Sequence, residues 1–147
     1  MKLLIAVDGS EQALDAVRHA LKLHRAGLKA SFILATVQAP AYGIETILAP
    51  NSGAFEKMSG IVGARLLKSA EALFDAANVP FSRDIAFGEP APELQELAQR
   101  HGCDGIVMGA RGMGFLRSAL MGSVSDAVLH SSSTMAVTIV RHATTGS

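Results

Sequence analysis

The segment GARGMGFLRSALMGSVS, residues 109–125, combines a G-x-x-G turn with a Gly-Ser pair nine residues further on. It follows Gly105 to Met108, a short apolar run that is typical of a buried strand, and it leads into VSDAVLHS, which has helical spacing. Glycine allows close backbone approach and positive φ, and the start of a helix supplies unpaired N–H donors. The segment therefore predicts a strand–loop–helix unit that holds a phosphate.

The composition indicates a single globular domain without a nucleic-acid partner. The 147 residues are 49% apolar and 18% charged, and 13 basic side chains balance 13 acidic ones, so the basic excess of a nucleic-acid binder is missing. Cys103 is the only cysteine, which excludes an intramolecular disulfide. The N-terminus has too short an apolar run for a signal peptide, and no stretch is suited to cross a membrane. We therefore expect a cytoplasmic protein.

Strand and helix patterns alternate along the whole chain. The expected strands are residues 3–7, 32–37, 81–87, 105–108 and 135–140, and the expected helices begin after Ser10, near Phe55, at Pro90 and after Gly122. Alternation of this kind predicts an α/β, doubly wound, Rossmann-like sandwich with a five-stranded parallel sheet in the order 3-2-1-4-5. We expect one domain over residues 1–143 and a flexible tail at 144–147.

The strand order brings two distant segments together. The chain reverses direction between the first and fourth strands, and ligands of such sheets bind beyond the carboxyl ends of the strands at that point. Asp8-Gly9-Ser10 follows the first strand, and Gly109 to Gly112 follow the fourth. Asp8 is expected to bind a ribose hydroxyl or Mg²⁺ through water, and it also fits a cap in an Asp-Gly-Ser turn.

The chain resembles the universal stress protein family, in its single-domain, ATP-binding type. The resemblance rests on IAVDGSE (5–11), GEPAPELQELAQRHGCDGIVMGARG (88–112), the GSVS turn (122–125) and AVTIVR (136–141). The spacing G-x2-G-x9-G-[ST] is the family's nucleotide signature. The resemblance implies an adenine nucleotide alpha hydrolase-like sandwich, ATP, ADP or AMP as ligand, homodimers, and a role in the stress response without a defined reaction.

The resemblance also implies site residues. Phosphate binding falls on Gly109, Gly112, Gly122 and Ser123, with Val124 and Ser125 in the first turn of the same helix. Base and ribose contacts fall on Ala6, Val7, Asp8, Val37 and Met108. Arg111 lies inside the loop, where it either contacts a phosphate or is a solvated cation. Ala110 and Ala136 depart from the family, which commonly has serine and proline there.

Two other functions stay open beside a regulatory nucleotide-binding dimer. The first is a slow ATPase or nucleotide phosphotransferase, although the loop lacks the lysine of a P-loop and no catalytic residue stands out. The second is a dimeric interaction module that needs no nucleotide.

The last expected strand also predicts an assembly. Met135–Val140 carries no charge, proline or glycine, so we expect this edge strand to pair with its copy in a two-fold dimer. An unidentified protein partner is also expected.

Overall fold

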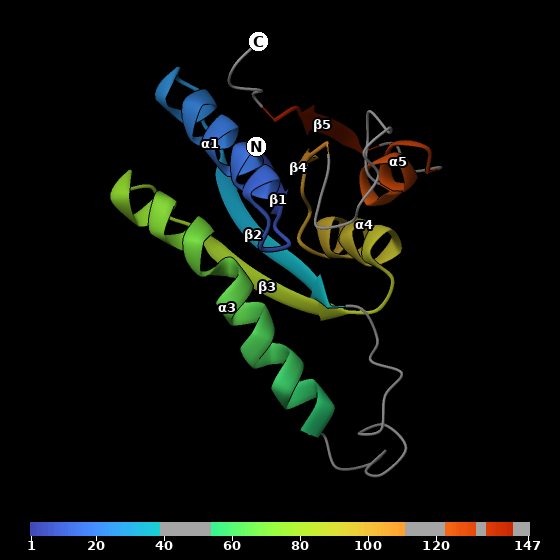
Figure 1. The fold of residues 1–147 in the computed structure, drawn as a ribbon. Helices are drawn as coiled ribbons and strands as arrows, with labels where there is room; N and C mark the ends of the chain where they lie inside the picture. Colours follow the sequence, from blue (N-terminus) through green and yellow to red (C-terminus); the bar gives the residue numbers. More distant parts are fainter. Residues whose placement is uncertain (39–53, 111–122, 132–134, 143–147) are drawn as a thin grey trace.

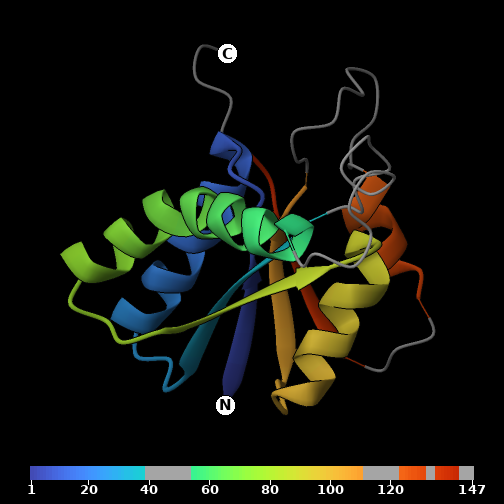
Figure 2. The same cartoon turned by 90° about the horizontal axis from the view of Figure 1, so that it is seen from below.

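A computed structural model describes residues 1–38, 54–110, 123–131 and 135–142, and it contains one parallel sheet with helices on both faces (Figures 1 and 2). The elements are, in chain order, β1 (Lys2–Ala6), α1 (Glu11–Arg25), β2 (Ser31–Gln38), α3 (Ala54–Ala76), β3 (Ser82–Phe87), α4 (Pro90–Arg100), β4 (Gly105–Gly109), α5 (Ser123–Leu129) and β5 (Ala136–Val140). The sheet order is β3-β2-β1-β4-β5, and all neighbouring strands are parallel. The predicted fold class and strand order are confirmed.

The sheet separates two apolar layers. Helices α1 and α3 cover one face, and α4 and α5 cover the other, as Figure 2 shows. Ile5 and Leu34 face α1 and α3, whereas their neighbours Leu4 and Ile33 face α4 and α5. Strands buried on both faces need an apolar residue at every position, which explains the unbroken runs in β1 and β2.

The element boundaries differ from the prediction by one or two residues. Gln38 extends β2 by one residue beyond the expected 32–37 and pairs with Phe87 of β3. The predicted edge position of β3 is confirmed, and its first residues, Ser82 and Arg83, are exposed. The predicted tail at 144–147 lies outside the described residues.

Helix α3 is continuous despite its two glycines. A Cβ atom at Gly63 would lie 2.6 Å from Cγ2 of Ile85 in β3, so the missing side chain allows α3 to lie directly on the edge strand. A Cβ atom at Gly60 would have no neighbour within 4 Å. Helix propensity alone would count Gly63 as unfavourable, whereas the close contact with Ile85 favours glycine at this position.

Candidate functional site

The carboxyl edge of the sheet brings the predicted binding segments together. β1 and β4 are neighbours, with Ile5 paired to Val107, so the chain leaves both strands at adjacent positions of one edge. Ala6, Val37 and Met108, the residues predicted to contact the base, all belong to the side of the sheet that faces α4 and α5. Ala6 and Val37 are half-buried, and Met108 is 5% exposed.

A hydrogen-bonded turn follows β1. Oδ1 of Asp8 accepts hydrogen bonds from the backbone N of Ser10 at 2.9 Å and from its Oγ at 2.5 Å. Ser10 Oγ in turn accepts a hydrogen bond from the backbone N of Ala13 at 3.1 Å, which caps α1 as predicted. Asp8 thus acts on the cap through Ser10 rather than as the cap itself.

Gly9 permits this turn for two reasons. Its φ is +86°, a left-handed conformation that favours glycine. A Cβ atom there would also lie 2.5 Å from Cδ2 of Leu66, so the turn is in close contact with α3. Leu66 of α3 therefore leaves no room for a side chain at Gly9, next to Asp8.

Ala110, just after β4, is hydrogen-bonded to both β5 and α5 at the other side of the candidate site. Its backbone N donates to the carbonyl of Val140 in β5, and its own carbonyl accepts from Oγ of Ser125 in α5, both at 2.8 Å. Ala110 is 6% exposed and Ser125 is 2% exposed, so both bonds are shielded from water. The hydroxyl of Ser125 thereby joins the two ends of the predicted phosphate loop.

Half of the predicted phosphate cradle can be located. Gly109 ends β4, Ser123 begins α5, and Val124 packs half-buried against the apolar layer under α4 and α5. Val7 is buried beside Asp8 and donates its backbone N–H to the carbonyl of Ala35. Arg111, Gly112 and Gly122 lie outside the described residues.

One buried polar group beside the site was missed by the sequence reasoning. Thr36 is 1% exposed, and its Oγ1 has no hydrogen-bond partner among the described residues. It precedes Val37 and faces the α1 and α3 layer, opposite the predicted base contacts. The only available signal was one hydroxyl residue in an otherwise apolar strand.

Metal-ligating groups, membrane-spanning helices and perturbed pKa values bear on what the described residues can do. Within these residues, no group of three metal-ligating side chains exists, and no helix is long and apolar enough to cross a membrane. Burial raises the pKa of the Cys103 thiol, although the charge of Lys2 opposes the effect. Cys103 lies before β4, at the amino end of the sheet, away from the predicted site.

This architecture defines a class. The sheet is parallel with the order 3-2-1-4-5, and an Asp-Gly-Ser turn and a glycine-rich segment follow its two adjacent central strands. This is the architecture of a doubly wound α/β domain, a class in which ligands generally bind at the switch point. Within that class, the chain belongs to the universal stress protein family, whose model matches residues 1–141.

Three known proteins of the family are similar to the chain over nearly their whole length. Universal stress protein YxiE of Bacillus subtilis is 31% identical over 146 residues, 95% of this chain and 98% of the relative. Universal stress protein UspA from Lactobacillus plantarum has the same fold, with a TM-score of 0.79, 20% identity and coverage of 96% and 97%. A universal stress protein solved in complex with cAMP is 28% identical, with a TM-score of 0.65 and 95% of each chain covered.

Proposed function

We propose that this chain binds an adenine nucleotide at the carboxyl edge of its sheet and acts as a regulatory protein of the stress response. The observation that carries the proposal is that the G-x2-G-x9-G-S signature begins at Gly109, the end of β4, and reaches α5 at Ser123, while β1, which the Asp8 turn follows, is the neighbour of β4. Binding of cAMP by a relative that is 28% identical supports it.

The proposed roles are those that the family resemblance implies. The backbones of Gly109, Gly112, Gly122 and Ser123 would bind the phosphates, with Val124, Ser125 and Arg111 beside them, and Ala6, Val7, Val37 and Met108 would surround the base. Asp8 would bind a ribose hydroxyl. A single carboxylate would hold Mg²⁺ only through water and the nucleotide's own phosphates.

Little or no turnover is expected from this site. Phosphoryl transfer needs charge neutralisation and a group that positions the nucleophile. Asp8 is the one predicted acid of the site, and its Oδ1 already supports the Ser10 cap. Release of phosphate in a single turnover, lost in Asp8→Asn, would instead favour the slow ATPase.

Calorimetric titration of nucleotide-free protein with ATP and Mg²⁺ tests the proposal. We expect micromolar binding that Gly122→Asp abolishes, because the new carboxylate would repel the phosphates. Gly102→Asp is the matched control: it adds the same charge at the amino end of β4, where φ is +65° and a Cβ has no neighbour within 4 Å. Absence of binding by the wild-type protein to any adenine nucleotide would favour the nucleotide-independent module.

The proposed assembly is a two-fold dimer through β5, in the cytoplasm, built from a domain over residues 1–143. β5 is an edge strand whose Ala136 and Thr138 are exposed. Light scattering should give a dimer at micromolar concentration, and Thr138→Lys should shift it to the monomer, because a charge protects an edge from pairing. A wild-type monomer at low and high salt would exclude this dimer.

A further inference from the structure

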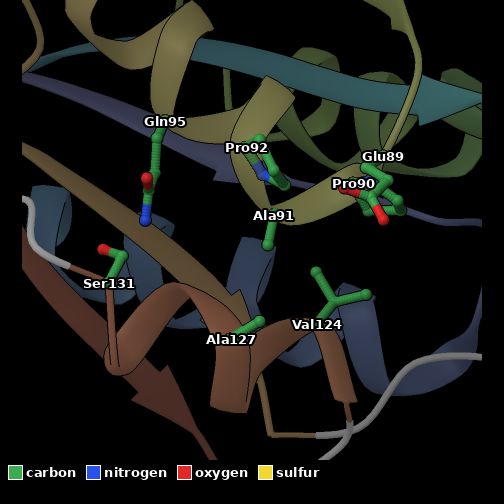
Figure 3. Close-up of a pocket in the computed structure, with 8 residues that line it drawn as sticks. All are labelled: Glu89, Pro90, Ala91, Pro92, Gln95, Val124, Ala127 and Ser131. Carbon is green, nitrogen blue, oxygen red and sulfur yellow. The ribbon is translucent and has the colours of Figure 1, made fainter.

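Helices α4 and α5 enclose a groove of about 350 Å³ on their side of the sheet (Figure 3). Its walls come from the first half of α4 and from the length of α5, and four apolar residues form its middle: Ala91, Pro92, Val124 and Ala127. This volume lies at the lower end of the range for ligand pockets, and it suits a single anchoring side chain.

The two ends of the groove carry different polar groups. Glu89 lies at one end, where it occupies the N-cap of α4 without a side-chain capping bond. Its exposed carboxylate forms no ion pair with any residue that the structure describes. At the other end, Gln95 Nε2 and Ser131 Oγ both donate to the carbonyl of Val128, at 3.4 and 2.9 Å. The carboxylate of Glu89, which has no ion-pair partner among the described residues, therefore lies at one end of the apolar groove.

Within α4 and α5, acidic side chains outnumber basic ones, although the chain as a whole is neutral. The two helices contain the acids Glu93, Glu96 and Asp126, and their only lysine or arginine is Arg100, at the far end of α4. Arg100 is paired with Glu96 at 3.2 Å, and His130, just after α5, lies 3.2 Å from Asp126, so Glu89 and Glu93 are the acids of this region without an ion pair among the described residues. The local potential therefore favours a cationic occupant and opposes a second anionic ligand.

We propose that this groove receives a lysine or arginine side chain from a basic segment of a partner protein. The aliphatic stem would lie along Ala91, Val124 and Ala127, while the cationic head would pair with Glu89. Lysine and arginine combine an apolar stem with a charged tip, which is the pattern that the groove presents. An arginine that fills a pocket in this way is typical of the residues that dominate protein–protein binding.

The proposed contact would be coupled to the nucleotide site. α5 forms one wall of the groove, and it is also tied to the end of β4 by the Ser125 hydrogen bond to Ala110. A nucleotide that shifts α5 would change the width of the groove and hence its affinity for the partner. This coupling rests on the proposed function, whereas the binding of a basic side chain does not.

The experiment is a titration of ¹⁵N-labelled, nucleotide-free protein with the peptide acetyl-Ala-Arg-Ala-amide, followed by NMR. Matched peptides with norleucine or glutamate in place of arginine separate the contributions of stem and charge. We expect saturable shifts concentrated in residues 89–95 and 124–131 for the arginine peptide, and weaker or absent shifts for the other two. Equal responses to arginine and norleucine, or shifts scattered over the surface, would overturn the proposal.

Two conservative variants make the assignment residue-specific. Glu89→Gln keeps the shape of the groove and should weaken the arginine peptide about three- to fivefold, as expected for one exposed ion pair. Glu96→Gln, at an exposed acid on the same helix that does not line the groove, should weaken the arginine peptide much less than Glu89→Gln does, because its charge acts only at a distance. An unchanged affinity in Glu89→Gln would contradict the role of its charge. Addition of ATP then tests the coupling, and failure of ATP to bind would leave the first result intact.

Discussion

Substitution of Gly63 by alanine should destabilise the protein, although alanine is the better helix former. The new Cβ would lie 2.6, 3.1 and 3.2 Å from Cγ2, Cδ1 and Cγ1 of Ile85, so either the side chain or α3 has to move. Overpacking of this kind costs about 1–3 kcal/mol, and the helix propensity of alanine returns about 1 kcal/mol. We expect a net loss of about 1 kcal/mol in the free energy of unfolding.

Gly60 provides the matched control in the same helix. Because a Cβ at Gly60 meets no atom within 4 Å, Gly60→Ala should gain about 0.5–1 kcal/mol. Urea unfolding followed by circular dichroism measures both variants, at one protein concentration and without nucleotide, since dimerisation and ligands also shift apparent stability. The two alanine variants should therefore change stability in opposite directions.

A double-mutant cycle identifies the contact responsible. Ile85→Ala removes all three clashing atoms, so Gly63→Ala should become neutral or stabilising in that background. If Gly63→Ala stabilises the wild-type protein as much as Gly60→Ala does, the close packing of α3 on β3 is refuted.

Three further predictions concern other parts of the molecule. Ser125→Ala should lower the free energy of unfolding in urea by about 1–3 kcal/mol, because the buried carbonyl of Ala110 loses its donor. Amide exchange at the end of β4 should become faster. A loss no larger than that of Ser69→Ala, at an exposed serine, would contradict this. Gly9→Ala should cost more than Gly27→Ala, since both have positive φ but only Gly9 adjoins a side chain, and equal losses would count against the turn. Cys103 should react slowly with a disulfide reagent at neutral pH and much faster in urea, because burial raises its thiol pKa; rapid labelling of the folded protein would argue otherwise.

The fold was predictable because local sequence patterns define its strands and helices, and general rules of chain connection leave few strand orders. The apolar run of β1 and the cap at Ser10 are visible in the sequence, and right-handed crossovers restrict the strand order. The extension of β2 through Gln38 was missed, because its pairing partner, Phe87, is almost fifty residues away. Packing between distant elements likewise decided the role of Gly63.

The candidate site was predictable only in part. Asp8 was identified from its Asp-Gly-Ser turn, but its action through Ser10 depends on side-chain geometry. The Ser125 bond to Ala110 spans the whole predicted loop and leaves no periodic signal. The groove depends on small residues, such as Ala91 and Ala127, that face each other across two helices. Small residues such as these give no signal in the sequence that distinguishes a groove from an ordinary helix surface.

The backbone hydrogen bond between Ala110 and β5 has a consequence for biosynthesis. The backbone N–H of Ala110 donates to the carbonyl of Val140, the last residue of β5. A nascent chain that has emerged through α5 holds the Asp8 turn and the glycine segment, but it cannot form this bond until β5 has also emerged. The nucleotide site that we propose would therefore mature only on chains that include β5, and products truncated before β5 would not compete for the ligand.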